Sequence, residues 1–177
     1  MARLHHRTAP GCTFFVTTKS SHSAGLFQVH TTADIIVAKL LHYRDAGAYQ
    51  LHAFVLMPNH LHVLLTPSST TSLEKAMQLI KGASSHEIHK QLGSRMEIWQ
   101  PGFHEATIRD EADYLSKVHY INQNPVAAGL AANPSDWTWS SASQRYRLDP
   151  IPQGLKPRTQ DHQMSELKLR PPNGKTA

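Results

Sequence analysis

The stretch that decides the fold reads Tyr49-Gln-Leu-His-Ala-Phe-Val-Leu-Met-Pro-Asn-His-Leu-His-Val-Leu-Leu65. Its first half, about Tyr49 to Leu56, is rich in aliphatic and aromatic residues and predicts a strand. The Pro58-Asn59 pair interrupts that pattern and is typical of a turn. From His60 to Leu65 the residues alternate before an apolar end, so the whole stretch predicts two antiparallel strands joined as a hairpin.

Further elements are predicted on both sides of this hairpin. In chain order they are a strand over 13–18, a helix over 31–46, the hairpin, an amphipathic helix over 72–92, a short hairpin or strand within 99–108, and a helix over 111–123. The last helix is expected to end before Pro125, because the residue preceding a proline disfavours helical backbone. This order predicts an α+β, ferredoxin-like (RRM-like) fold, an antiparallel sheet with helices packed on it.

The sequence changes character after about residue 146. Prolines accumulate among charged and polar residues, and residues 147–177 hold six Lys or Arg against three Asp or Glu. We therefore expect one folded domain over 1–146 and a basic, proline-rich, extended or disordered tail over 147–177. The whole chain has a net charge of +5 and a pI near 9.5, which favours an anionic partner only weakly because most of the surplus lies in this tail.

Cysteine and hydropathy limit the class of protein. The single cysteine, Cys12, excludes an intramolecular disulfide framework and any cysteine-rich zinc module. Any metal site must therefore use histidine, carboxylate or amide ligands. No apolar run approaches the roughly 18 residues that a membrane span requires, and the basic start of the chain lacks the apolar stretch of a signal peptide. We expect a cytoplasmic protein that does not contact membranes.

Two of the thirteen histidines stand out by their spacing. His60 and His62 flank Leu61 on a predicted strand, so the two imidazoles share one face and Leu61 enters the other. Their Cα atoms would lie roughly 6.5–7 Å apart, from which both rings can converge on one metal ion. Spacing alone also fits two solvated strand histidines.

A second pair of candidates lies near the end of the last helix. Tyr120 and Asn124 are four residues apart and share a helix face. An Asn carbonyl can complete a metal site begun by two histidines, and the phenol of Tyr120 would lie beside the group that the metal polarises. Phenolate attacks phosphorus well but is scarce at neutral pH, because a free phenol has a pKa of about 10. The alternatives are a tyrosine that packs its ring and an asparagine that ends a helix. Tyr114 is the rival nucleophile, but no asparagine follows it at four residues.

These residues together resemble a known family. The stretch 57–65 resembles the HUH motif of the small single-strand transposases. The spacing to Ile80-Lys-Gly82, Trp99-Gln-Pro-Gly-Phe-His104, Tyr120-Ile-Asn-Gln-Asn-Pro-Val-Ala-Ala-Gly-Leu130 and Trp137-Thr-Trp-Ser-Ser141 resembles the REP-associated tyrosine transposases in particular. The resemblance covers about residues 13–141.

The resemblance implies a mechanism. His60 and His62 would bind Mg²⁺ or Mn²⁺, Asn124 would complete the metal site, and Tyr120 would be the nucleophile. Such proteins cleave single-stranded DNA beside palindromic hairpins, leave a 5′-phosphotyrosine link and a free 3′-OH, and rejoin strands without an external energy source. Family relatives build the site within one chain or across a dimer, so a monomer and a homodimer are both open.

Other residues are candidates for contact with DNA. Lys81 is a candidate for contact with DNA phosphate or a solvated lysine, and His104 is a candidate DNA ligand or a strand-edge histidine. The three tryptophans could stack on bases, but packing is the better interpretation. Two alternative functions remain. One is a domesticated protein that binds hairpin or repeat DNA without cleavage. The other is a zinc hydrolase, which needs a third histidine or carboxylate ligand.

Overall fold

A computed structural model describes residues 11–21, 25–93, 95–153 and 155 of the 177-residue chain. The principal elements are β1 (Phe14–Lys19), α1 (His30–Asp45), β2 (Tyr49–Met57), β3 (His60–Pro67), α2 (Leu73–Leu92), β4 (His104–Thr107) and α3 (Glu111–Ala127). Short 3-10 turns lie at Leu26–Gln28, Pro134–Asp136 and Ser141–Ser143. None of the helices in these described ranges is both long and apolar enough to cross a membrane.

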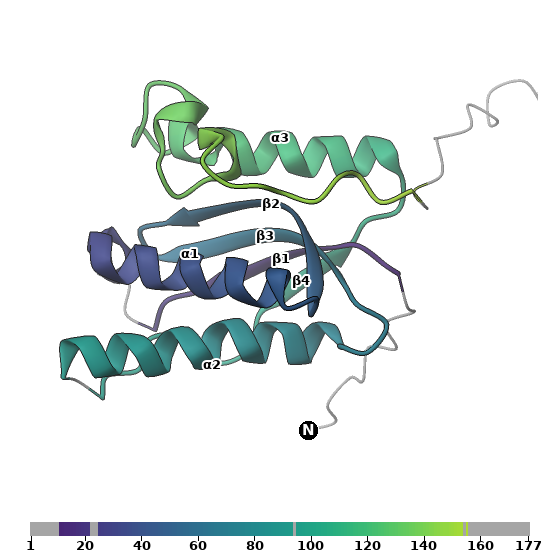
Figure 1. The fold of residues 1–177 in the computed structure, drawn as a ribbon. Coiled ribbons are helices and arrows are strands. Elements are labelled where there is room, and N and C mark those ends of the chain that lie inside the picture. The colour runs from purple at the N-terminus through teal and green to yellow at the C-terminus, as the bar shows by residue number, and fades with distance from the viewer. Residues whose placement is uncertain (1–10, 22–24, 94, 154, 156–177) are drawn as a thin grey trace, which may run out of the picture.

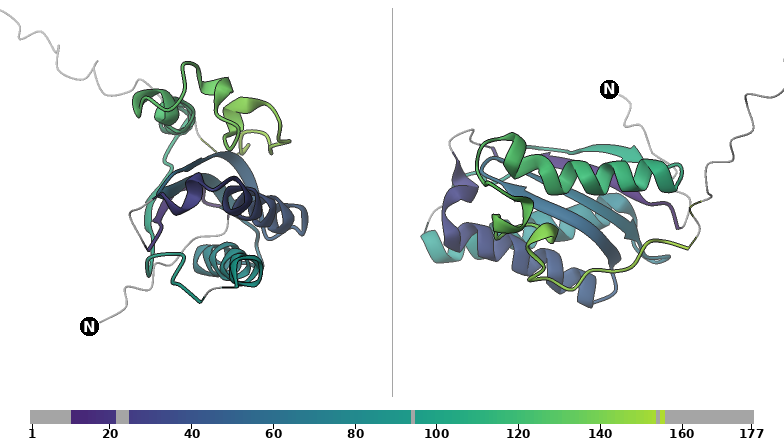
Figure 2. Two further views of the ribbon diagram at one scale, coloured as in Figure 1. Left: turned by 90° about the vertical axis from the view of Figure 1, so that its left-hand side faces the viewer. Right: turned by 90° about the horizontal axis from the view of Figure 1, so that it is seen from above.

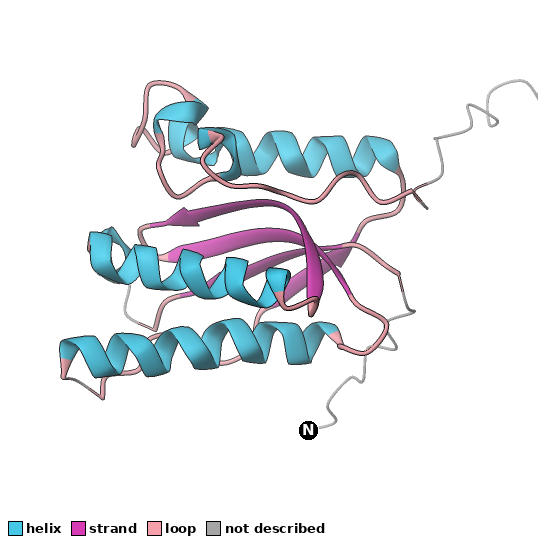
Figure 3. Ribbon diagram, viewed as in Figure 1, coloured by secondary structure: helices cyan, strands magenta, loops and turns pink. Residues whose placement is uncertain are grey.

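The four strands form one antiparallel sheet in the order β2-β3-β1-β4 (Figures 1 and 3). This order and the β-α-β-β-α-β connectivity confirm the predicted α+β ferredoxin-like fold. The predicted element within 99–108 is present as the short edge strand β4, but it forms no hairpin of its own and pairs with β1. Trp99 forms an isolated bridge with Ser20, the residue that follows β1.

Helices cover both faces of the sheet. In Figures 1 and 2, α1 and α2 lie on one face and α3 lies on the other. Strand alternation divides the apolar residues between two cores: Phe14 and Val16 of β1 pack in the α1–α2 core, whereas Phe15 packs against the core under α3. On β3, Leu61 and its alternate neighbours Val63 and Leu65 belong to the α1–α2 core. The histidines of β3 therefore belong to the α3 face.

Helix α3 is longer than predicted. The expectation that it ends before Pro125 is wrong, since the helix continues to Ala127 with Pro125 inside it. A proline in a helix interior costs about 3 kcal/mol, because it lacks an N–H and crowds the preceding turn. Ile121 and Pro125 are both buried here, and this burial offsets the cost. The Ala128 N–H donates to the Asn124 carbonyl, and the turn ends at Gly129, which adopts a left-handed φ of 68°.

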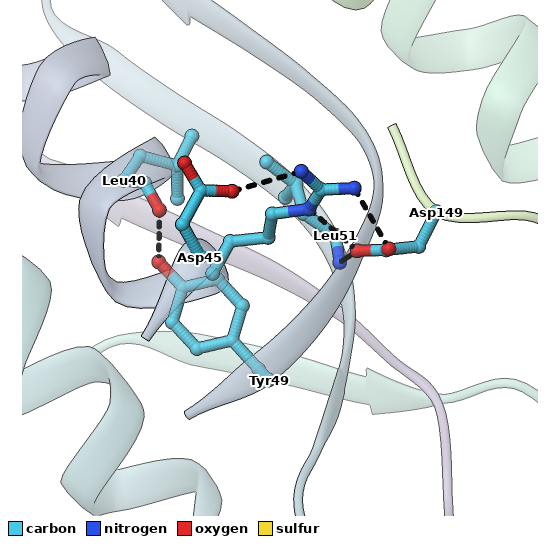
Figure 4. Close-up of polar contacts among 6 residues, drawn as sticks. Leu40, Asp45, Tyr49, Leu51 and Asp149 are labelled. Carbon is cyan, nitrogen blue, oxygen red and sulfur yellow. Dashed lines mark hydrogen bonds and ion pairs between the residues drawn. The ribbon is translucent and has the colours of Figure 1, made fainter. Parts of the chain in front are cut away.

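Packed structure also continues past residue 146, where the folded domain was predicted to end. The Asp149 carboxylate accepts hydrogen bonds from the Arg44 guanidinium at 2.8 and 2.9 Å. It also accepts one from the Leu51 N–H of β2 at 2.8 Å (Figure 4). The Asp149 N–H in turn donates to the Leu51 carbonyl. These bonds attach the segment after α3 to the outer edge of β2, so the predicted boundary divides a packed region. The predicted tail beyond residue 155 lies outside the described residues.

Candidate active site

His60 and His62 lie side by side on the α3 face of β3. Their ring centroids are 4.6 Å apart, and Leu61 between them is fully buried in the opposite core. The predicted shared face of the two imidazoles is therefore confirmed. The physical reason is the two-residue repeat of a strand, which places alternate side chains on the same side.

Helix α3 brings Tyr120 to this pair. The Tyr120 and His62 ring centroids are 5.3 Å apart at an interplanar angle of 69°. The side chain of Tyr120 remains 48% exposed, so a substrate can reach the phenol from solvent. Residues 58 positions apart in the sequence thus form one cluster, with an exposed hydroxyl-bearing ring against a buried imidazole.

Hydrogen bonds orient both imidazoles. Nδ1 of His60 lies 2.7 Å from Oδ1 of Asn59, and since an amide oxygen only accepts, Nδ1 carries the proton and Nε2 presents its lone pair. Nδ1 of His62 lies 2.8 Å from Oγ1 of Thr17, a hydroxyl that can accept in the same way. An acceptor on the far nitrogen is the usual support of a metal-binding histidine.

Burial keeps both histidines in the neutral form that binds metal. Burial, together with the neighbouring His60, lowers the pKa of His62 to about 3. Burial and the nearby charge of Lys19 also lower the pKa of His60. Both rings are therefore uncharged at neutral pH, and a protonated imidazole could not donate a lone pair to a cation.

Asn124 lies one turn beyond Tyr120 on α3 and is half-buried. No side-chain hydrogen bond engages its amide within the described ranges, so its carbonyl oxygen is available as a ligand. Imidazole nitrogens and an amide oxygen are ligand types that divalent cations accept, and the role of Asn124 as a ligand stays a prediction. Within the part of the chain that the structure describes, no group of three or more His, Cys, Asp or Glu side chains could hold a metal. The zinc-hydrolase alternative therefore gains no third ligand from the geometry.

The sequence matches the model of a known protein family. The model described as "Transposase IS200 like" matches residues 16–124, a range that includes His60, His62, Tyr120 and Asn124. The chain belongs to the IS200-like transposase family. This assignment confirms the family resemblance of the sequence.

Two curated relatives and one solved structure narrow the resemblance. The chain is 33% identical over 94 residues to the REP-associated tyrosine transposase of Escherichia coli (strain K12), covering 52% of this chain and 54% of that relative. It is 26% identical over 115 residues to a putative REP-associated tyrosine transposase of Haemophilus influenzae, covering 59% and 65%. The match thus spans little more than half of the first relative and just under two thirds of the second.

The solved structure is that of a REP-associated tyrosine transposase bound to a REP hairpin. It superposes with a TM-score of 0.68 at 26% identity, covering 86% of this chain and 90% of the other. The fold of this IS200-like transposase is therefore the fold of that protein.

Tyr114, the rival nucleophile, lies in the core under α3. It is 5% exposed and its ring meets His52 edge-on at 5.8 Å. Burial raises the pKa of Tyr114, which makes its phenolate still scarcer. In this IS200-like transposase the tyrosine beside the histidine pair is Tyr120.

Lys81 and His104, the candidates for contact with DNA, have different surroundings. Nζ of Lys81 donates to the carbonyl oxygens of Gln100 and Gly102, each at 2.7 Å, and burial lowers its pKa. Lys81 thus supports the loop before β4, and its contact with DNA stays a prediction. His104 is exposed and pairs across the sheet with Thr17, which in turn pairs with His62. His104 therefore lies on the face that holds the site, two strands away.

The three tryptophans pack inside the protein, which agrees with the interpretation of the sequence. Trp99 is buried and its Nε1 donates to Ser84, while Trp139 is buried and donates to Asp34. Trp137 is half-buried and donates to the Leu56 carbonyl. Each indole N–H is satisfied inside the protein, which is the arrangement of a packed tryptophan.

Four residues of the site region escaped the sequence analysis: Phe15, Thr17, Asn59 and Lys117. Thr17 and Phe15 alternate on β1 and so share a face, but which face meets α3 is set by strand pairing. Asn59 immediately precedes His60 and could have been found as a polar neighbour of the pair. Lys117 carried no signal, because lysine on a helix is usually solvated.

Proposed function

We propose that this chain is a metal-dependent single-stranded DNA nicking and strand-joining enzyme of the transposase type. It acts beside DNA hairpins through a 5′-phosphotyrosine intermediate on Tyr120. The observation that carries the proposal is the contact between Tyr120 of α3 and His62 of β3, because it places an exposed phenol beside two neutral imidazoles. Family membership supports it, since the matched range contains all four residues.

His60, His62 and Asn124 would hold the divalent cation, Mg²⁺ or Mn²⁺. The cation supplies charge neutralisation at a phosphodiester that acquires extra negative charge in the transition state. Asn59 and Thr17 orient the imidazoles by hydrogen bonds to Nδ1. The chain's own contribution is therefore a fixed donor set and a phenol held next to it.

Tyr120 supplies the nucleophile. Its phenolic oxygen forms a bond to phosphorus while the bond from phosphorus to the 3′ oxygen of the upstream nucleotide breaks. The phenol loses its proton, and the departing 3′ oxygen gains one, so the products are a 5′-phosphotyrosine and a free 3′-OH. Attack of a 3′-OH on the phosphotyrosine reverses these bond changes and rejoins strands, and no external energy source is needed.

Hairpin DNA as the partner rests on the relative. The superposed structure is described as bound to a REP hairpin, and we propose the same class of partner here. A cytoplasmic location and a monomeric or homodimeric state are parts of the proposal that come from the sequence.

The test is adduct formation with a single-stranded hairpin oligonucleotide from the flanks of the gene in Mn²⁺. The wild-type protein should form a covalent species that survives a denaturing gel. Tyr120→Phe should lose it completely while hairpin affinity stays within a few-fold, and Tyr114→Phe, the matched control, should keep it. An adduct on Tyr120→Phe would disprove the assignment of the nucleophile.

Metal binding needs a readout of its own. His62→Asn should weaken Mn²⁺ binding, measured by electron paramagnetic resonance without DNA, by about 10-fold or more. His86→Asn, on an exposed position of α2, should not change it. Hairpin binding without any adduct in Mn²⁺ would favour the domesticated, non-cleaving alternative.

A further inference from the structure

Lys117 lies against the proposed active site without an ionic partner. It belongs to α3, three residues before Tyr120, and its Nζ is 5.2 Å from the centroid of the Phe15 ring. Within the described residues no carboxylate forms an ion pair with it. Asp113, the acidic residue one turn earlier, contacts Arg109 instead, with 3.5 Å between Nε and Oδ2. The ammonium is thus held by a ring rather than by an opposite charge.

Phe15 joins this ammonium to both halves of the site. Its ring stacks on His62 with centroids 5.2 Å apart at 23°. It also meets Tyr120 edge-on, with centroids 5.8 Å apart at 83°. One aromatic side chain therefore touches the imidazole, the phenol and the cation, and it limits the ammonium to the immediate surroundings of the other two. An ammonium over a ring face is held by the ring quadrupole without losing its hydrogen-bond donors.

The sheet surface beside Lys117 is open. Helix α3 packs mainly over β2 and β3 and meets β1 at Phe15, so the remainder of this face of β1 and β4 extends beside the helix. His104 and Ala106 of β4 and Lys19 of β1 are exposed there. Glu105 pairs with Val16, whose side chain faces the α1–α2 core, so this carboxylate points to the opposite face. The open strip thus carries lysine and histidine side chains and reaches Phe15 and Tyr120.

We propose that Lys117 contacts the phosphodiester on which Tyr120 acts and neutralises charge on its non-bridging oxygens in the transition state. This inference rests on the proposed function. A strand that follows the open strip to the exposed phenol of Tyr120 passes the ammonium of Lys117. A cation already held beside the reaction centre stabilises developing negative charge without reorganising, which is the most effective form of electrostatic catalysis.

The test is the single-turnover rate of adduct formation at saturating hairpin DNA in Mn²⁺. Lys117→Gln should lower that rate about 10- to 100-fold, the size of one charge-assisted hydrogen bond, and Lys117→Arg should restore most of it. Lys90→Gln, at an exposed position of α2 on the other side of the sheet, is the matched control and should leave the rate unchanged.

An uncharged linkage at the reacting position distinguishes contact of Lys117 with the substrate from a structural effect of Lys117. With a methylphosphonate at the reacting position, the ratio of wild-type to Lys117→Gln rates should fall towards one, because there is less charge to neutralise. A ratio as large as with the natural phosphate would overturn the proposal, as would a wild-type rate for Lys117→Gln. If the wild-type protein forms no adduct at all, the proposed function fails and this inference falls with it. If the wild-type protein forms the adduct and Lys117→Gln forms it at the same rate, this inference alone is refuted.

Discussion

Replacement of Asp149 by alanine tests how the segment after α3 is attached to the sheet. In the folded chain this carboxylate accepts two hydrogen bonds from Arg44 and one from the Leu51 N–H. Leu51 is fully buried, so loss of the carboxylate leaves a buried donor without its acceptor. Such a donor costs about 1–3 kcal/mol. The loss of the bidentate pair adds to it, and we expect a decrease of about 2–4 kcal/mol in the free energy of unfolding.

The assay is urea unfolding followed by circular dichroism at neutral pH. With a slope of about 2 kcal/mol per molar urea, typical of small domains, the midpoint should shift by about 1–2 M. Asp45 is the matched control, because it also contacts Arg44, at 2.9 Å, but its side chain is 67% exposed. Asp45→Ala should cost at most about 1 kcal/mol, as exposed ion pairs do.

Protonation of Asp149, and removal of the segment that contains it, should also lower the free energy of unfolding. The Arg44 contact lowers the pKa of Asp149, so its contribution is present above the ordinary carboxyl pKa and is lost as pH falls through the lowered one. A chain ending at Tyr146 should be destabilised at least as much as Asp149→Ala. Equal stability of Asp149→Ala and Asp45→Ala, or of the truncated and full chains, would refute this account of the attachment.

Two further predictions concern His62 and the loop before β4. The pKa of His62 is lowered to about 3 in the folded chain. In the unfolded chain this imidazole is protonated below about pH 6.5, whereas in the folded chain it stays neutral there. The free energy of unfolding should therefore fall by up to about 1.4 kcal/mol per pH unit below pH 6.5. Metal-free His62→Gln should show a correspondingly flatter slope in urea unfolding, and an equal slope would contradict burial of a neutral His62. Lys81→Met removes two donors from the carbonyls of Gln100 and Gly102 and should speed amide hydrogen exchange in the 100–103 loop. It should also cost about 1–3 kcal/mol, whereas the exposed control Lys75→Met should stay within about 0.5 kcal/mol.

The histidine pair was predictable because it depends on one strand. A two-residue repeat is a property of extended backbone, so His60 and His62 share a face in any sheet that contains this strand. The partner on the helix is different. Helix periodicity places Tyr120 and Asn124 on one side of α3, but it does not say that this side meets His62. The family resemblance predicted that Tyr120 lies near the histidines, and the packing of α3 on the sheet brings Tyr120 into contact with His62.

The errors have a common origin in long-range packing. Local backbone preference predicts that a helix ends before Pro125, yet burial of the last turn continues it to Ala127. Local composition likewise predicts a tail from residue 147, yet Asp149 meets Arg44 from 105 positions away in the sequence. Neither the apolar partner nor the ionic partner is visible in the neighbouring residues.

The order of elements, the sheet fold and the shared face of His60 and His62 could thus be predicted from the sequence, because they follow from periodicities of two and 3.6 residues. Long-range packing is what brings Phe15 into contact with both His62 and Tyr120, places Lys117 over the same ring, and attaches the Asp149 segment to β2. Those contacts join elements that are distant in the chain. Their partners are set by strand order and by the face that each helix covers, which no local pattern specifies.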